Sequence, residues 1–272
     1  MSKFDTMEQF DNVIYSLYNF YSSIVFKLSS HKYVSKNYQF KNKYKNKRCF
    51  ILGNGPSLNV SDLKKIQNEY TFCVNYFYKS QLSNYINPSF YVLYDGNFYD
   101  KNIKDFIECK TKYDKSIFFM RDNALIKYKH EFLKLDNIFY QHAKHFQNGD
   151  KCNIDLTKNI SAPVNVVVAA IQIALYMGFS EIYLLGCDFN SFASREELHF
   201  YKDTAEKTIS LADELKFYSL VAKHHYSLEK LSKEIGSKII NLTKNSLLDA
   251  YEFGNINDLE LEKKFDNHEC TK

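Results

Sequence analysis

The sequence predicts an α/β fold: a single Rossmann-like domain with a mostly parallel, doubly wound sheet. Short apolar runs alternate with helix-like segments from residue 49 onward, and this alternation is typical of parallel sheets with helices on both faces. Most of the runs end in glycine or in a polar residue. The first run leads into a glycine-containing turn and then a helix-like segment, the order in which Rossmann-like sheets present a loop to a ligand.

Seven apolar runs are expected to be strands. They cover residues 50–52, 70–74, 90–94, 116–120, 137–140, 181–185 and 238–242. The spacing predicts helices over 62–67, 164–177 and 204–235, and Gly178 is a typical stop for the second of them. Residues 189–225 mix charged and aromatic side chains and fit a sheet poorly, so we expect a small lid there. The predicted catalytic domain covers 49–272.

Residues 1–48 are predicted to form an N-terminal amphipathic helix and a basic linker. Apolar residues recur at helical spacing from Phe10 to Leu28. The basic residues that follow are Lys41, Lys43, Lys45, Lys47 and Arg48. An aromatic amphipathic helix beside such a segment can bind an anionic membrane surface. The alternative is a helix that packs on the domain, followed by a solvated linker.

Composition excludes several classes of protein. The net charge of +4 over 272 residues is too small to indicate nucleic-acid binding. The six cysteines contain no C-x-x-C pair, so neither a zinc site nor a disulfide framework is predicted. No apolar run reaches the roughly 18 residues of a membrane span, and the N-terminus is acidic where a signal peptide is basic. We expect a cytoplasmic protein, with peripheral binding at the inner membrane and a homo-oligomer both left open.

The turn after the first strand is the strongest functional signal. Gly53, Asn54, Gly55, Pro56 and Ser57 lie there, in a chain with only eight glycines and three prolines. Glycine permits positive φ and close approach of the backbone to a ligand, and the start of the next helix favours phosphate. The turn is a candidate nucleotide-binding loop. It is also consistent with an ordinary strand-to-helix turn, because it lacks the dinucleotide spacing and the P-loop lysine.

Polar residues follow three further predicted strands. Asn75, Asp95 and Asp188 each stand where a strand ends, and ligands of such sheets lie outside the carboxyl ends of the strands. Asn75 and Asp95 can also be ordinary turn residues. Ser161 precedes the 164–177 helix, where it can contribute to an anion site or simply cap the helix.

Histidines of the predicted lid are the candidate general bases. His224, His225 and His199 fall in it, and a histidine near its ordinary pKa can take a proton from a hydroxyl at neutral pH. A histidine in such a segment is more often a surface residue. Adjacent residues on a helix point about 100° apart, so we expect only one of His224 and His225 to face the cleft.

Four segments resemble one known group of proteins. The segments are 51–58 (ILGNGPSL), 74–78, 173–189 and 245–248. They are similar to the bacterial lipooligosaccharide sialyltransferases of glycosyltransferase family 42. They are also similar to the wider glycan-cluster domain family, which includes flagellin-glycosylation proteins and a hydroxymethylpterin pyrophosphokinase. The resemblance covers roughly residues 49–250.

The resemblance implies a CMP-sialic acid donor, no metal and a Rossmann-like domain with a lid. Asn54, Gly55 and Ser57 would touch the nucleotide and its phosphate, and Asn75 would contact the donor. Asp95 stands where the sialyltransferases carry an asparagine. A carboxylate near a phosphate is repulsive unless it is protonated or metal-bound, so this departure implies a different donor or a metal.

The resemblance also implies a lid histidine as the catalytic base. No histidine lies at the family's distance from the 245–248 segment, and His225, favoured slightly, and His224 lie a few residues later. The arginine that the family carries before the long helix is missing. Both departures weaken the implied donor more than the implied fold.

These observations favour a glycosyltransferase of bacterial surface-glycan biosynthesis, acting on lipooligosaccharide, O-antigen or capsule. It would transfer a nonulosonic acid such as sialic acid from its CMP donor, with inversion, to a hydroxyl of a glycan or glycolipid acceptor. Backbone N–H groups and Tyr201 would stabilise the leaving phosphate. One alternative is a phosphoryl or diphosphoryl transferase whose Asp95 and Asp188 hold Mg²⁺. Another is a non-catalytic nucleotide-binding relative.

Overall fold

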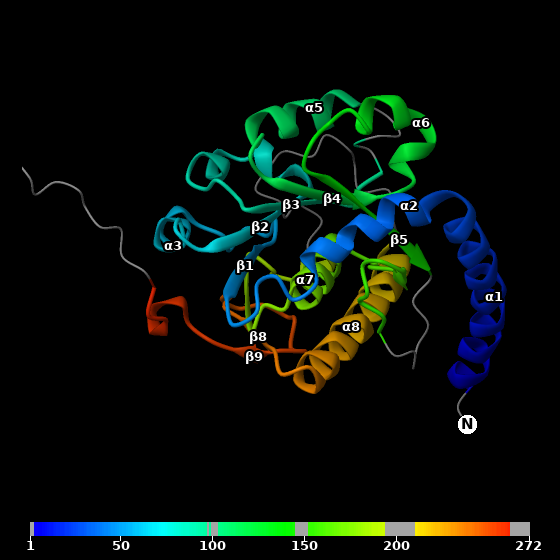
Figure 1. The fold of residues 1–272 in the computed structure, drawn as a ribbon. Helices are drawn as coiled ribbons and strands as arrows, with labels where there is room; N and C mark the ends of the chain where they lie inside the picture. The colour runs from blue at the N-terminus through cyan, green and yellow to red at the C-terminus, as the bar shows by residue number, and fades with distance from the viewer. Residues whose placement is uncertain (1–2, 97, 99–102, 145–151, 194–209, 262–272) are drawn as a thin grey trace, which may run out of the picture.

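The computed structural model describes residues 3–96, 98, 103–144, 152–193 and 210–261. Within these ranges nine strands form one sheet, and all neighbouring strands pair in parallel. Their order across the sheet is β6-β5-β4-β3-β2-β1-β7-β8-β9 (Figure 1). The predicted fold class is therefore confirmed.

All seven predicted strands are present. The strands are β1 (Arg48–Leu52), β2 (Tyr70–Val74), β3 (Phe90–Leu93), β4 (Ile117–Arg121), β5 (Ile138–Lys144), β6 (Asn159–Ser161), β7 (Glu181–Leu185), β8 (Lys238–Asn241) and β9 (Glu252–Phe253). The sequence analysis missed β6 and β9, which have three and two residues and are too short to show a pattern.

Helices cover both faces of the sheet. They are α3 (Val60–Lys65), α5 (Ile103–Lys112), α6 (Ala124–Phe132), α7 (Val166–Met177) and α8 (Leu211–Glu234). In β1, Cys49 and Ile51 pack in the cluster that contains α7 and α8. Phe50 and Leu52 point to the other face and join the cluster that contains α3, α5 and α6. Strands buried on both faces read as continuous apolar runs, which is why the sequence analysis found them.

Helix α7 begins later than predicted. Its N-cap is Asn165, whose Oδ1 accepts the amide N–H of Val168 at 2.9 Å. Ser161 is instead the last residue of β6 and is fully buried. Its Oγ accepts the amide N–H of Asn153, so the structure gives Ser161 a place in the core and not at the start of the helix. The predicted end holds, because Gly178 has φ of 84°.

The N-terminal segment is helical for longer than predicted. Helix α1 (Lys3–Val25) continues into a π-helical turn (Phe26–Ser30), α2 (His31–Val34) and a 3₁₀ helix (Ser35–Phe40). Arg48 is the first residue of β1 and does not belong to a linker. Its guanidinium donates two hydrogen bonds to the Glu69 carboxylate, at 2.7 and 3.0 Å. No helix in the described ranges is long and apolar enough to cross a membrane.

The predicted lid extends too far along the chain. Residues 211–225 are the first half of α8, which packs on α7 and β8. Ser210 caps this helix by accepting the amide N–H of Asp213. The part of the predicted lid from residue 211 onward therefore belongs to the main body. Residues 194–209 lie outside the described ranges.

Two glycines provide a matched test of the end of α7. Gly178 (φ 84°) and Gly236 (φ 77°) both adopt the left-handed conformation, but a Cβ on Gly178 would lie 2.9 Å from the Asn42 Cα, whereas a Cβ on Gly236 meets nothing within 4 Å. We expect Gly236→Ala to lower the free energy of unfolding by about 1–2 kcal/mol. Gly178→Ala should cost more, because the 41–46 loop must move. Equal losses in urea titrations would contradict the close contact.

Candidate active site

The strand order reverses at β1. This strand lies between β2 and β7, so the chain leaves it towards one edge and returns on the other side. Ligands of doubly wound sheets bind at such a switch point, outside the carboxyl ends of the strands. The loops that follow β1 and β7 meet there. Gly53 donates its N–H to the Leu185 carbonyl at 2.8 Å, and Gly55 donates to the Gly186 carbonyl at 2.9 Å.

A carboxylate fixes the two loops to each other. Ser57 Oγ donates to Asp188 Oδ2 at 2.8 Å, and the Ser57 amide N–H donates to Asp188 Oδ1 at 3.3 Å. Asp188 is only 8% exposed. Burial raises the pKa of its carboxyl, and the two hydrogen bonds from Ser57 oppose that rise. The predicted residues Ser57 and Asp188 therefore come together, as partners of one another.

The glycines of this turn are required by close packing. A Cβ at Gly53 would lie 2.3 Å from the Gly186 carbonyl oxygen, and a Cβ at Gly55 would lie 1.8 Å from Asp188 Oδ2. Neither residue has positive φ, unlike the prediction. The N–H groups of Gly53, Gly55 and Ser57 already donate to protein acceptors. This arrangement does not support the prediction that they face a phosphate.

Two asparagines complete the rim. Asn54 donates from Nδ2 to the Val74 carbonyl at 3.3 Å, and its buried Oδ1 has no partner in the described part of the chain. Asn75 has φ of 41°, and its Oδ1 accepts the amide N–H groups of Tyr94 at 3.0 Å and Asp95 at 3.3 Å. Asn75 thus fastens the end of β2 to the end of β3. Asp95 is half-buried on this rim.

The sequence analysis missed Gln141 and Asp122, which lie at the same edge. Gln141 is level with Arg121 at the end of β4. Its Oε1 accepts the Tyr94 hydroxyl at 2.5 Å, while its buried Nε2 has no partner among the described residues. Asp122 follows β4 directly, so the strand-end rule that singled out Asp95 could also have found Asp122.

The structure does not support the prediction that His224 or His225 faces the cleft. Both are fully buried in α8. His224 Nε2 lies 3.4 Å from Cys152 Sγ, and His225 Nδ1 lies 2.8 Å from the Tyr251 hydroxyl. Burial lowers the pKa of His224 to about 4 and that of His225 to about 3. Val221 and both histidines form the face of α8 that packs into the core, and this helical spacing was visible in the sequence. His199 and Tyr201 lie outside the described ranges.

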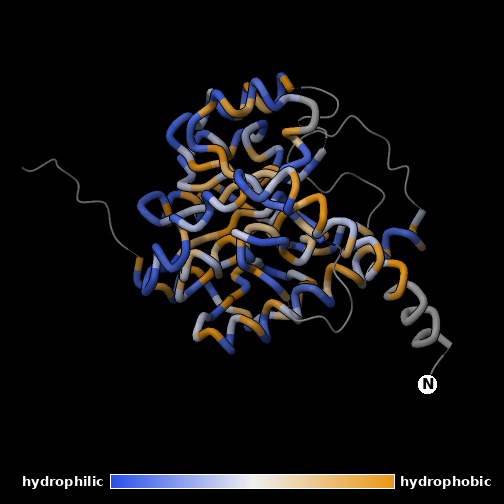
Figure 2. Tube along the Cα trace, turned by 45° about the vertical axis from the view of Figure 1, so that its right-hand side comes forward, coloured by the Kyte–Doolittle hydropathy of each residue, from blue (hydrophilic) through white to orange (hydrophobic). Residues whose placement is uncertain are grey.

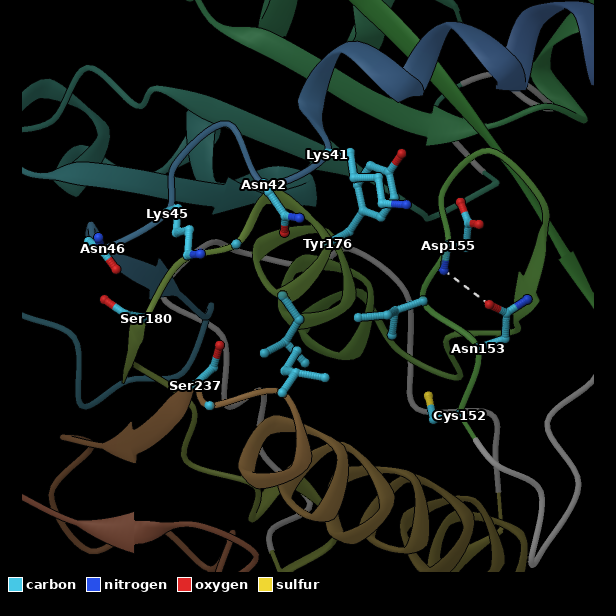
Figure 3. A pocket seen from close by; sticks show the side chains of 15 residues that line it. Lys41, Asn42, Lys45, Asn46, Cys152, Asn153, Asp155, Tyr176, Ser180 and Ser237 are labelled. Atoms are coloured by element: carbon cyan, nitrogen blue, oxygen red, sulfur yellow. Dashed lines mark hydrogen bonds between the residues drawn. The ribbon is translucent and has the colours of Figure 1, made fainter.

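A hollow of about 570 Å³ lies at the opposite edge of the sheet. Lys41 and Lys45 line it on one side, and Ser180 and Ser237, just before β7 and β8, line it on another (Figure 3). Helices α7 and α8 both end here, and the carbonyl end of a helix repels anions. The switch point is therefore the better candidate for a nucleotide site.

Comparisons with known proteins extend this assignment. The family model described as 6-hydroxymethylpterin diphosphokinase MptE-like matches residues 25–192, more than half of the 272-residue chain. The chain belongs to the MptE-like family. The MptE-like segment contains β1 to β7, the Gly53–Ser57 loop and Asp188, so it includes both sides of the crevice. No curated protein matches the chain in sequence.

Solved structures show the fold of this MptE-like protein in other proteins. The MAf glycosyltransferase from Magnetospirillum magneticum AMB-1 superposes with a TM-score of 0.50 at 13% identity, over 85% of this chain and 39% of that one. The α-2,3-sialyltransferase Cst-I from Campylobacter jejuni gives a TM-score of 0.47 at 16% identity, over 82% of this chain and 86% of that one. This chain thus spans 39% of the MAf protein, and the likeness is one of fold.

The buried histidines make stability depend on pH. In the unfolded chain they titrate near 6.5, whereas burial holds the pKa of His225 to about 3 in the folded protein. Between pH 7 and 4 the unfolded state takes up protons that the folded state does not, so stability falls as pH falls, by at most about 1.4 kcal/mol per pH unit for each histidine. We expect His225→Gln to flatten this dependence in urea titrations at pH 7, 6 and 5. The control His130→Gln, at an exposed position of α6, should keep it; identical curves for both variants would contradict the burial.

Proposed function

We propose that this protein is a transferase that passes a group from a nucleotide-activated donor to a hydroxyl at the switch-point crevice. Membership of the MptE-like family and the glycosyltransferase-like fold support a transferase. The finer proposal is a glycosyltransferase of bacterial surface-glycan biosynthesis. Its donor is a CMP-activated nonulosonic acid such as sialic acid, and its acceptor is a hydroxyl of a glycan or glycolipid.

The observation that carries this choice is the Ser57–Asp188 pair. A diphosphoryl transferase would use Mg²⁺, which binds carboxylate oxygens together with substrate phosphates. Both oxygens of Asp188 accept hydrogen bonds from Ser57, so Asp188 fits its role as a loop brace better than that of a metal ligand. In the described ranges no three His, Cys, Asp or Glu side chains form a metal-binding group. Glycosyl transfer without a metal does not require carboxylate ligands for Mg²⁺ at this site.

Such a transfer needs a residue that binds the nucleotide, a base for the acceptor hydroxyl and a group that contacts the leaving phosphate. In this proposal Asn54 Oδ1, which is buried and has no partner in the described ranges, accepts a hydrogen bond from a nucleotide amino or hydroxyl group. The acceptor hydroxyl must lose a proton, and a positioned base typically contributes a factor of about 10²–10⁴. With His224 and His225 in the core, the candidates for this base are His199 of the predicted lid and Asp95 on the rim. Tyr201 stays a proposed contact of the leaving phosphate.

The family description supports a second candidate function. Diphosphoryl transfer from ATP to a hydroxymethylpterin also joins a nucleotide donor to a hydroxyl, and it would use the same crevice. Asp95 and Asp188 would then hold Mg²⁺, with Asp188 using the lone pairs that do not accept the hydrogen bonds from Ser57. The two candidates differ in the base of the nucleotide and in the need for metal.

A thermal-shift panel of CMP, CDP, UDP, GDP and ATP, each with Mg²⁺ and with EDTA, separates them. We expect CMP or CDP to give the largest stabilisation in either condition, about 2.7 kcal/mol at 100 times the Kd. Asn54→Ala should reduce the shift, and Asn59→Ser, which keeps the cap of α3, should not. A shift with ATP and Mg²⁺ alone would assign the diphosphoryl reaction instead.

A further inference from the structure

The outward face of helix α1 is apolar. Leu17 and Phe20 of α1 are 70% and 69% exposed. Leu28 lies in the π-helical turn that continues α1 and is 84% exposed. Four more apolar side chains on this face are between 43% and 64% exposed: Val13, Ile14, Tyr21 and Ile24. The helix runs along the edge of the molecule, outside the layers that cover the sheet (Figure 1), and apolar segments of it stand clear of the body (Figure 2). Each of these seven side chains is thus more than four tenths exposed in the described structure.

The inward face of the same helix is mostly polar, and Phe26 in the π-helical turn is its buried apolar residue. Asn19 and Ser22 are buried, and Ser22 Oγ lies 3.0 Å from His142 Nε2. His142 Nδ1 in turn lies 2.6 Å from Asp122 Oδ2. Ser, His and Asp in this order have the connectivity of a hydrolytic triad, but the Ser22 hydroxyl is buried under its own helix and its carbonyl oxygen also lies 3.1 Å from His142 Nε2. The three side chains therefore act as a tether.

The two faces lie on opposite sides of the helix. At 100° per residue, the exposed apolar positions from Val13 to Leu28 span about 120° of the circumference, centred opposite Asn19 and Ser22. An amphipathic helix at the surface of a globular domain normally turns its apolar stripe towards the core. Helix α1 turns it away and is attached by the polar contacts of Ser22 and by Phe26, whose ring centroid lies 5.2 Å from that of His142. This inversion leaves the apolar stripe for something outside the chain.

The distribution of charged residues along the sequence indicates what the apolar stripe of α1 contacts. The preceding residues of α1 carry Lys3, Asp5, Glu8 and Asp11, whereas residues 12–61 contain eight of the chain's 36 basic residues and none of its 32 acidic residues. All seven lysines of this segment are exposed. The lysines begin at Lys27, after α1 ends at Val25, and an anionic lipid surface attracts such a segment by about 1 kcal/mol per lysine near the surface.

We propose that α1 lies in the plane of an anionic membrane surface, with its apolar stripe in the acyl boundary and the 27–47 lysines at the headgroups. Aromatic and aliphatic side chains on one face and lysines beside them are the features of helices that lie on membranes. The tether through Ser22 and His142 keeps the sheet attached to the helix at a fixed position. The helix lies on the surface and does not span the bilayer, in keeping with its composition.

Vesicle flotation of the full-length protein tests this proposal. We expect it to float with phosphatidylglycerol–phosphatidylcholine vesicles, and at least tenfold less with pure phosphatidylcholine or in 0.5 M salt. The double variant Leu17→Ser, Phe20→Ser should lose at least tenfold of the binding. The matched double variant Leu133→Ser, Leu135→Ser removes two exposed leucines elsewhere (42% and 40% exposed) and should bind like the wild type.

Two further measurements keep the result decisive. All variants should unfold at the wild-type temperature, because the replaced side chains face solvent. Light scattering without lipid should show a monomer at micromolar concentration. A lipid-free dimer that Leu17→Ser, Phe20→Ser dissociates would show that a second copy covers the stripe and would overturn the proposal. So would a folded protein that floats with no vesicle, or a Leu133, Leu135 variant that loses as much binding as the α1 variant.

Discussion

The hydrogen bonds between Ser57 and Asp188 are the contact on which the crevice depends. They join the loops after β1 and β7, two strands that are neighbours in the sheet but more than 100 residues apart in sequence. Because the loops touch, Gly53 and Gly55 cannot carry side chains. The same contact leaves Asn54 between the strand ends, with one buried acceptor unused in the described ranges. A buried carboxylate that accepts two hydrogen bonds holds such a junction more firmly than neutral groups would.

The carboxyl edge extends this design across the sheet. Asn75 ties β2 to β3, and Tyr94 reaches across to Gln141 of β5. Most of the polar atoms at the edge are thus occupied by each other, which sets the positions of the few that are not. A rim built in this way is rigid before any ligand arrives, and preorganised polar groups are what stabilise charge in group transfer.

The sequence predicted the sheet well because its strands are buried on both faces. Runs such as 90–93 and 182–185 are apolar and buried throughout, so their position is independent of any neighbour. It also placed Ser57, Asn75, Asp95 and Asp188 at one edge, since parallel strands end together. It could not show that Ser57 and Asp188 bond to each other, because that contact depends on strand order, which local pattern does not contain.

The errors have similar causes. The lid prediction includes His224 and His225 because residues 189–225 mix charged and aromatic side chains, yet the spacing of Val221, the two histidines and Leu228 marks the core face of α8. Ser161 was placed before a helix whose cap is Asn165, because β6 has only three residues. In α1 the periodicity was correct, but periodicity alone gives no direction. Only the buried contacts of Ser22 show that the apolar stripe points outward.

Amide hydrogen exchange in the free protein tests the central claim most directly. If the loops after β1 and β7 are joined as described, the amides of Gly53, Gly55 and Ser57 are protected without any nucleotide. Asp188→Ala then speeds exchange at Ser57 and Gly55 at least tenfold, which corresponds to a loss of about 1.4 kcal/mol in the free energy of local opening. The strand amides of β7 keep their wild-type rates in this variant. In the control Asp95→Ala, Ser57 and Gly55 also exchange at wild-type rates. Fast exchange at Gly55 and Ser57 in the wild-type protein, or no change in Asp188→Ala, would contradict the account.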